Sequence, residues 1–382
     1  MKIEHEAVPL TLVAPGSATM TDGQRPEKIF VTRAFLPPLV EYTHYLERIW
    51  QSNHLTNQGP LLKEFEDKTK SFLGVSNFQF VTNGTIALQL ALRALDITGG
   101  EVITTPFSYV ATTSSILWER CQPVFVDIDP DTFCIDAAKI EAAITEQTQA
   151  ILAVHVYGNP CDVEVIEAIA KKHNLKVIYD AAHAFGVTYK GQSLLTWGDI
   201  STCSFHATKL FHTIEGGALV TNDEQLAENI DLLKRFGHNN DDHIQLGMNG
   251  KASEFQAAMG LCNLSHFDQI ISERKRISEH YESLLADRFQ RPLLRPGTGY
   301  NYAYCVITMP SPEELEAAVA RLHAENIFPR RYFFPSLNKL PYLTKHQSMP
   351  ISEDIAERVL CLPLYVGLDE ATIERICQIL MA

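Results

Sequence analysis

Short apolar runs alternate with helix-patterned segments along much of this 382-residue chain. The runs that we interpret as strands lie at 78–81, 102–105, 124–128, 151–156 and 177–180. Segments with apolar residues at helical spacing follow at 84–95, 111–118, 140–144 and 163–173. Strands that are apolar throughout are typical of a parallel sheet that is covered on both faces. The sequence therefore predicts an α/β fold with a mostly parallel sheet.

The domain division follows from where this alternation begins and ends. In residues 1–28, two prolines bracket a short apolar stretch and acids stand where a signal peptide has positive charge, so we expect a flexible arm. Residues 29–250 carry the alternation and are predicted to form the large domain. Residues 251–382 are expected to begin with one long charged helix, from Ser253 to about Phe289, and to continue as a smaller α+β domain.

Composition excludes several classes of partner. A formal net charge of −14, with no long basic run, argues against nucleic acid and against an anionic membrane surface. No apolar run approaches the length of a membrane span. The eight cysteines are scattered without a CxxC pair, which is typical of buried thiols in a reducing compartment, and we expect a cytoplasmic protein. Histidines 183, 206 and 212 lack the spacing of a ligand set, so we predict no metal site.

Polar residues follow several of the predicted strands, at the sheet edge where open parallel sheets bind their ligands. Thr82-Asn-Gly-Thr85 stands between a strand and a helix, where backbone amides and the helix dipole would suit a phosphate. An ordinary Asn-Gly turn explains the same residues. Tyr109 follows the next strand and offers a ring that can lie on a planar ligand, although most aromatics in such positions belong to the core.

Two ionisable residues have the strongest chemical setting. Asp180 ends the apolar strand Val177-Ile-Tyr, where a buried carboxylate needs a partner; a helix cap or a salt bridge would also supply one. Lys209 lies between apolar neighbours in Ser204-Phe-His-Ala-Thr-Lys-Leu-Phe, ahead of two glycines. Desolvation there would lower its pKa and favour the neutral amine that forms Schiff bases, whereas most lysines are simply solvated.

Taken together and in this order, these motifs resemble the DegT/StrS-type nucleotide-sugar aminotransferases, which are pyridoxal 5′-phosphate (PLP) enzymes of fold type I. The resemblance extends from about Phe30 to the C-terminus. It implies a seven-stranded sheet with helices on both faces and a smaller C-terminal domain. It also implies a homodimer with shared active sites.

The resemblance assigns roles around the cofactor ring. Lys209 would form the Schiff base and move protons, and Asp180 would pair with the pyridine nitrogen. His183 would contact the phenolic oxygen, where many members carry glutamine, and Tyr109 would stack on the ring. One branch of the family replaces the lysine with histidine and catalyses dehydration, so the retained lysine favours transamination.

Further roles concern the phosphate and the substrate. Gly84, Thr85 and Ser204 would bind the cofactor phosphate. Asn249 matches a segment that reaches into the neighbouring subunit's site. Substrate binding is expected from Lys251, Arg330 and Arg331, although Lys251 stands where many members have arginine and the arginine pair also suits a solvated edge.

The stretches 102–113, 154–163 and 330–336 look most like enzymes that convert dTDP-4-keto-6-deoxy-D-glucose into dTDP-4-amino-4,6-dideoxy-D-glucose with L-glutamate as amino donor. Such sugars serve the assembly of O-antigen, a part of lipopolysaccharide, and of related glycans. A 3-keto-sugar aminotransferase, a PLP-dependent dehydratase and a regulatory relative without chemistry remain as alternatives.

Overall fold

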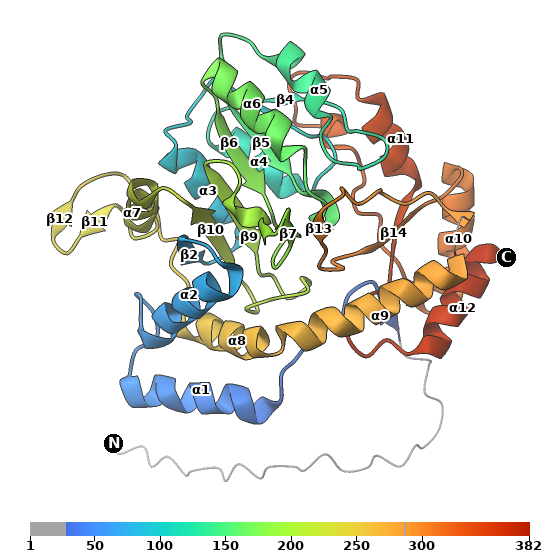
Figure 1. Ribbon diagram of the computed structural model, residues 1–382, viewed down its shortest axis with the longest axis horizontal. Coiled ribbons are helices and arrows are strands. Elements are labelled where there is room, and N and C mark those ends of the chain that lie inside the picture. The colour runs from blue at the N-terminus through green and yellow to red at the C-terminus, as the bar shows by residue number, and fades with distance from the viewer. Residues whose placement is uncertain (1–27, 286–287) are drawn as a thin grey trace, which may run out of the picture.

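The computed structural model describes residues 28–285 and 288–382 (Figure 1). The arm predicted over residues 1–28 lies outside the described residues, apart from Lys28. Figure 1 shows a central sheet with helices packed around it, and a long helix, α9 (Phe267–Leu285), that runs from the sheet towards the C-terminal end of the chain.

The central sheet has seven strands in the order β2-β10-β9-β6-β5-β3-β4. Six strands run parallel to one another, and β10 is antiparallel to both of its neighbours, β2 and β9. Their bounds are β2 (Asn77–Val81), β3 (Glu101–Thr104), β4 (Gln122–Phe125), β5 (Thr148–Val154), β6 (Lys176–Asp180), β9 (Ile200–Ser204) and β10 (Gly217–Thr221). The prediction of a mostly parallel seven-stranded sheet is confirmed.

Both faces of this sheet are buried, because alternate residues of each strand face opposite sides. In β5, Ile151 and Ala153 join one hydrophobic cluster, while Ala150 and Leu152 join another on the opposite face. Helices α3 (Gly84–Ala94), α4 (Val110–Trp118) and α7 (Glu224–Leu233) cover the second face. The first face is covered by α2 (Pro60–Leu73), α6 (Val163–His173) and α8 (Glu254–Ser265). This two-sided burial explains why the strands are apolar throughout.

The single long helix predicted from Ser253 to about Phe289 is wrong. The structure has two helices, because α8 ends at Ser265 and α9 begins at Phe267. The intervening His266 has ψ 5°, and its N–H bonds the carbonyl of Asn263 in a tightened last turn. The helical periodicity continues on both sides of this break, so the pattern of residues did not reveal it.

The C-terminal unit is a small α+β assembly. Strands β14 (Cys305–Thr308) and β16 (Val359–Leu362) pair antiparallel and pack with α9, α10 (Pro312–Ala324) and α12 (Glu370–Met381). A short strand near the start of the described chain, β1 (Ile29–Phe30), pairs with β15 (Ile327–Phe328) of this unit. Helix α1 (Leu39–Ser52) instead packs on α8, below the central sheet in Figure 1.

One buried charged group holds parts of the C-terminal unit together, and another attaches this unit to the sheet. Arg274 on α9 donates hydrogen bonds to the carbonyls of Tyr302 (2.9 Å), Ala303 (2.7 Å) and Leu364 (2.9 Å). Asp127, which follows β4, accepts bonds from the N–H groups of residues 351 and 352 at the start of α11 (Pro350–Arg358), both at 2.9 Å. The larger hydrophobic cluster also continues into this unit.

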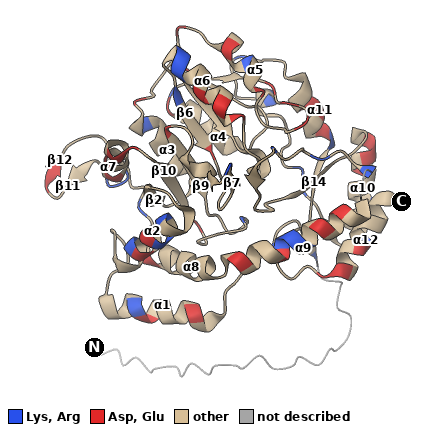
Figure 2. Ribbon diagram, in the orientation of Figure 1, with Lys and Arg blue, Asp and Glu red and all other residues tan. Residues whose placement is uncertain are grey.

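Figure 2 shows acidic and basic residues interspersed along the outer helices, while the strands of the central sheet contain few of them. All eight cysteines are buried and none forms a disulfide, as expected from their scattered positions. Among the described residues, no helix is both long enough and apolar enough to cross a membrane.

Candidate active site

A cavity of about 310 Å³ opens at the carboxyl ends of the parallel strands, where the sequence places its polar motifs. Eight of the predicted site residues line it, and they come from five separate segments of the chain. These residues are Gly84, Thr85, Tyr109, Asp180, His183, Ser204, Lys209 and Arg330. The structure therefore brings together residues that are far apart in the sequence.

The start of α3 forms one wall of the cavity. The Asn83 side chain accepts the N–H of Ile86 at 2.9 Å, and the Asn83 carbonyl accepts that of Ala87, so the N–H groups of Gly84 and Thr85 stay available at the helix start. A Cβ on Gly84 would lie only 2.8 Å from the Cβ of Ser204. The missing side chain thus lets the helix start approach the end of β9, which makes a cradle suited to an anion.

Asp180 lies at the end of β6 and is only 6% exposed. Its Oδ2 accepts the hydroxyl of Thr112 at 2.7 Å, and its Oδ1 accepts the N–H of Ala182 at 3.1 Å. Burial raises the pKa of Asp180, while these two hydrogen bonds and the nearby Lys209 oppose that shift. A cationic ligand group beside this carboxylate would further favour its ionised form.

His183 is held from two sides. Its Nδ1 accepts the N–H of Tyr157 at 3.2 Å, and the Asn301 side chain donates to the His183 carbonyl at 2.8 Å. Burial, with a smaller contribution from Lys209, places the pKa of His183 well below 6.5, so the ring is neutral at pH 7. Since Nδ1 is an acceptor, the ring proton resides on Nε2, and His183 presents a hydrogen-bond donor.

Lys209 lies in the loop between β9 and β10, where its N–H bonds the His206 carbonyl at 2.8 Å. Burial lowers the pKa of its amine from 10.5 to about 8, although the charge of Asp180 opposes this shift. A large fraction of this amine is therefore neutral at mildly alkaline pH. The unprotonated amine is the nucleophilic form, so the loop prepares Lys209 for attack on a carbonyl carbon.

Aromatic side chains line the rest of the cavity. Tyr109, directly before α4, is 60% exposed, so its ring is available to a ligand. Tyr304, Tyr332 and Phe333 line the cavity from the C-terminal unit, and the Phe333 ring is stacked on His183 with centroids 5.6 Å apart. Sequence reasoning missed this aromatic wall, although residues 332 and 333 lie in a stretch that it singled out for the substrate.

The sequence analysis also did not predict three polar residues in or beside the cavity, two with a hydroxyl group and one with a carboxyl group. Ser108 lies two residues before α4, Thr112 lies in its first turn, and Glu215 stands next to the glycine pair. Because Ser108 precedes the helix, the sequence spacing of these two residues gave no signal of the contact between their hydroxyl groups.

Three predicted substrate or partner residues do not line this cavity. Arg331 donates to the carbonyls of Ala356 (3.2 Å) and Glu357 (3.1 Å) and to the Glu357 carboxylate (3.0 Å). Asn249 and Lys251 lie outside the cavity, beside the end of β2. The backbone of Lys251 pairs with that of Val81 in an isolated antiparallel β-bridge. Among the described residues, no group of three or more potential metal ligands occurs.

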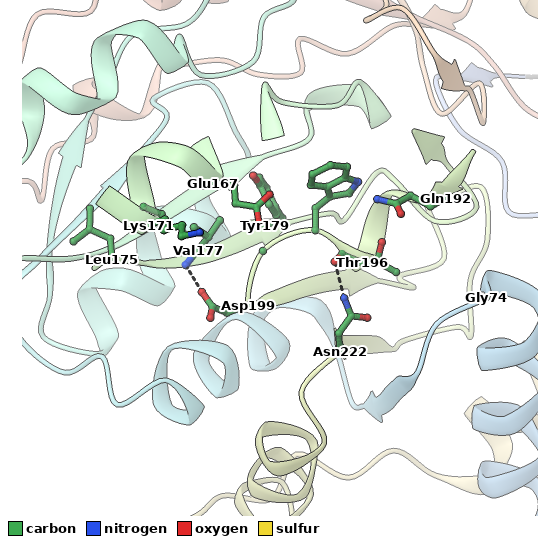
Figure 3. A pocket seen from close by; sticks show the side chains of 13 residues that line it. Gly74, Glu167, Lys171, Leu175, Val177, Tyr179, Gln192, Thr196, Asp199 and Asn222 are labelled. Carbon is green, nitrogen blue, oxygen red and sulfur yellow. Dashed lines mark hydrogen bonds between the residues drawn. The ribbon is translucent and has the colours of Figure 1, made fainter. Parts of the chain in front are cut away.

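A more open pocket of about 730 Å³ lies at the other end of the sheet (Figure 3). Its residues surround the beginnings of β6 and β9, where Asp199 accepts the N–H of Val177 at 2.7 Å and Asn222 donates to the Thr196 carbonyl at 2.9 Å. None of the predicted site residues lines it. We therefore place the chemistry in the smaller cavity.

Residues 40–381 match the model of the DegT/DnrJ/EryC1/StrS aminotransferase family. A dTDP-4-amino-4,6-dideoxy-D-glucose transaminase from Shigella dysenteriae is 45% identical over 356 residues, which cover 91% of this chain and 97% of the relative. The crystal structure of DesI in the presence of its TDP-sugar product has a TM-score of 0.87 at 34% identity, with 92% of each chain covered. The PLP form of the sugar aminotransferase Spr1654 from Streptococcus pneumoniae has a TM-score of 0.86 at 26% identity, and covers 93% of this chain and 98% of that one.

Proposed function

The chain belongs to the DegT/DnrJ/EryC1/StrS aminotransferase family, and from this premise we propose its substrates and cofactor. It transfers an amino group from L-glutamate to dTDP-4-keto-6-deoxy-D-glucose, and the product is dTDP-4-amino-4,6-dideoxy-D-glucose. The cofactor is PLP. Identity of 45% to a transaminase named for this product supports the choice of sugar. The chain covers nearly all of that relative, so the likeness includes both the sheet and the C-terminal unit.

One observation carries the proposal: a lysine with a lowered pKa shares a single cavity with a buried aspartate and a glycine cradle. An ordinary structural lysine would keep its charge at a surface or beside a carboxylate. Lys209 has no salt bridge among the described residues, and its neighbours at 203, 205, 210 and 211 are buried. This setting is suited to an amine that must react as a base and a nucleophile.

The residues around the cavity fit PLP. The N–H groups of Gly84 and Thr85 and the hydroxyl of Ser204 would hold the phosphate, since a side chain at position 84 would fill that space. Asp180 would hold the ring nitrogen in its protonated form, and the Nε2–H of His183 would donate to the phenolic oxygen. Tyr109 would cover one face of the ring.

When bound, PLP supplies an aldehyde that condenses with amines and a ring that withdraws electrons from the reacting carbon. Lys209 has the proton-transfer role: as a neutral amine it takes a proton from the α-carbon of the donor, and as an ammonium ion it returns a proton. A pKa of about 8 suits both directions near neutral pH, because neither form is rare. The walls from Tyr304 and Phe333 limit the access of water to these atoms.

Arg330 is the proposed ligand for an anionic part of the substrate. Its guanidinium lies over the Tyr332 ring, 5.6 Å from the centroid, at the edge of the cavity. Arg331 keeps its predicted substrate role only as a weaker proposal, because its guanidinium is held by Glu357 and by backbone carbonyls.

We also propose a homodimer in which Asn249 and Lys251 act at the partner's site. Both lie outside the cavity of their own chain, and Asn249 is exposed. Exposed apolar side chains surround this segment, and an apolar surface of this kind is suited to a second copy of the chain. They are Phe236, Ile244 and Leu246.

The test is incubation of the PLP-loaded protein with L-glutamate and a panel of nucleotide-linked keto-sugars. We expect equimolar 2-oxoglutarate and 4-amino sugar with the dTDP-linked 4-keto-6-deoxy substrate, and the amino carbon is identified by NMR. Lys209→Ala serves as the control and should remain folded without activity. Absence of 2-oxoglutarate with every sugar would refute the transaminase assignment, and amination at another carbon would refute the choice of substrate.

A further inference from the structure

The hydroxyl groups of Ser108 and Thr112 form a row of two hydrogen bonds that ends on the carboxylate of Asp180. The Ser108 and Thr112 hydroxyl oxygens are 2.8 Å apart, and the Thr112 hydroxyl oxygen is 2.7 Å from Oδ2 of Asp180. Ser108, Thr112 and Asp180 are 3%, 0% and 6% exposed. Buried hydrogen bonds of this length, ending on a carboxylate, are among the stronger ones in proteins.

The number of available protons fixes which group donates in each of these two hydrogen bonds. An ionised Asp180 has no proton to give, so the single hydroxyl proton of Thr112 must point to Oδ2. Ser108 must then donate its own proton to the Thr112 oxygen. Each donor polarises the next, so the two bonds strengthen one another. If Asp180 takes up a proton, its hydrogen bond from Thr112 weakens, because a neutral carboxyl group is a poorer acceptor than a carboxylate.

Asp180 meets few other polar groups. The N–H of Ala182 bonds Oδ1 at 3.1 Å, the amine of Lys209 acts on it through its charge, and the Cys203 thiol lies near it on β9. Burial raises the pKa of Asp180, and the Thr112 hydroxyl is the strongest opposing influence, ahead of Ala182 and Lys209. The Thr112 hydroxyl is therefore the largest single influence that favours the ionised carboxyl before any ligand is bound.

We propose that Ser108 and Thr112 are positioning residues: they form a hydroxyl relay that keeps Asp180 ionised and correctly oriented to receive the protonated ring nitrogen of the cofactor. This inference rests on the proposed function for the identity of the ring. The relay itself belongs to the protein without cofactor, so it can be tested there.

The first test titrates Asp180 in the cofactor-free protein. Aspartate carboxyl carbons are labelled with ¹³C, and the Asp180 resonance is identified by its absence in Asp180→Asn. Thr112→Val keeps the shape of the side chain and removes the hydroxyl, and we expect the Asp180 midpoint to rise by about one to two pH units, a ten- to hundredfold change in proton affinity. Ser108→Ala should raise it less, by about threefold or below in proton affinity.

The chain offers a matched control in the next residue. Thr113 is also 0% exposed on α4, and its hydroxyl has no hydrogen-bond partner among the described residues. Thr113→Val should leave the Asp180 midpoint unchanged, and Thr112→Ser, which restores a hydroxyl, should return it towards the wild-type value. A Thr112→Val protein that titrates like the wild type, or a Thr113→Val protein with the same rise, would overturn the proposal.

The second test adds PLP and follows its dissociation constant and the pH dependence of its visible absorbance. We expect Thr112→Val to weaken PLP binding about tenfold and to shift the absorbance titration, with Thr113→Val unaffected. Failure of the wild-type protein to bind PLP would refute the proposed function, and the titration of the cofactor-free protein would still decide whether the relay keeps Asp180 ionised. Normal PLP affinity and absorbance in Thr112→Val would refute the positioning role.

Discussion

Replacing Lys209 with methionine should stabilise the cofactor-free protein while abolishing its activity. Methionine has about the length of the lysine stem and fits an apolar surrounding without a charge. Burial lowers the pKa of the Lys209 amine from 10.5 to about 8, which means that the folded protein disfavours its charged form. Below pH 8 the wild-type protein folds with a charged Lys209, and burial of this charge lowers its free energy of unfolding.

The size of the effect follows from the pKa. A fall from 10.5 to about 8 corresponds to about 3 kcal/mol, and water in the cavity screens part of it, so we expect about 2–3 kcal/mol at pH 7. Below pH 8 the stability difference between Lys209→Met and the wild type does not depend on pH, because Lys209 is charged in both the folded and the unfolded chain. Between pH 8 and 10.5 only the unfolded chain is charged, so wild-type stability rises and the advantage of Lys209→Met fades.

The assay is urea unfolding of the cofactor-free wild type and variant at pH 7, 9 and 10.5, compared as differences at each pH. Lys234→Met is the matched control, because the Lys234 side chain is 2% exposed but donates to Gln79 at 2.6 Å and lies 3.3 Å from Glu66. Removing this partnered lysine should destabilise the protein by about 2 kcal/mol or more.

The reasoning fails if Lys209→Met is no more stable than the wild type at pH 7. It also fails if the difference between the two proteins is the same at pH 7 and pH 10.5, since a constant gain would reflect packing and not the charge. In either case, the claim that the fold prepares a neutral amine would have to be abandoned.

Four further substitutions test other parts of the site. Asn301→Ala removes the donor to the His183 carbonyl, and should lower the free energy of unfolding by about 2 kcal/mol and weaken PLP binding, measured by urea unfolding and by cofactor titration. Gly84→Ala places a Cβ 2.8 Å from the Cβ of Ser204 at the end of β9, so the two segments must move apart; it should lower the melting temperature and reduce PLP affinity at least tenfold, and unchanged affinity would contradict the phosphate cradle. Arg330→Ala should raise the KM for the nucleotide sugar about tenfold with a smaller change in kcat, whereas Arg331→Ala should mainly lower stability; equal effects on KM would contradict the assignment of Arg330.

The sheet was predictable because its strands are continuous apolar runs. The helix predicted over 163–173 has the observed bounds, and the one predicted over 84–95 differs by one residue at its end. Helices α1 and α2 were not predicted, although α2 buries residues at helical spacing, which are Leu61, Leu62, Phe65, Thr69 and Leu73. The antiparallel direction of β10 also left no mark in the sequence, since a buried strand reads the same in either direction.

The candidate site was predictable where one residue alone signals its chemistry. Lys209 and Asp180 follow apolar strands, so their burial was foreseeable from their neighbours. The contacts that hold Asp180 and His183 were not predictable, because Thr112, Tyr157 and Asn301 reach these two residues from segments that only the tertiary fold brings near. The packing of Arg331 against α11 was likewise outside the reach of sequence patterns.

The attachment of the C-terminal unit by Asp127 has a consequence for the part of the cavity wall that this unit supplies. A carboxylate that accepts two backbone N–H groups at the start of α11 opposes separation of this unit from the end of β4. Tyr304, Tyr332 and Phe333, which line the cavity from the C-terminal unit, are therefore held against the sheet by a contact that lies outside the cavity. Loss of the Asp127 carboxylate would then loosen this wall without changing any residue that lines the cavity.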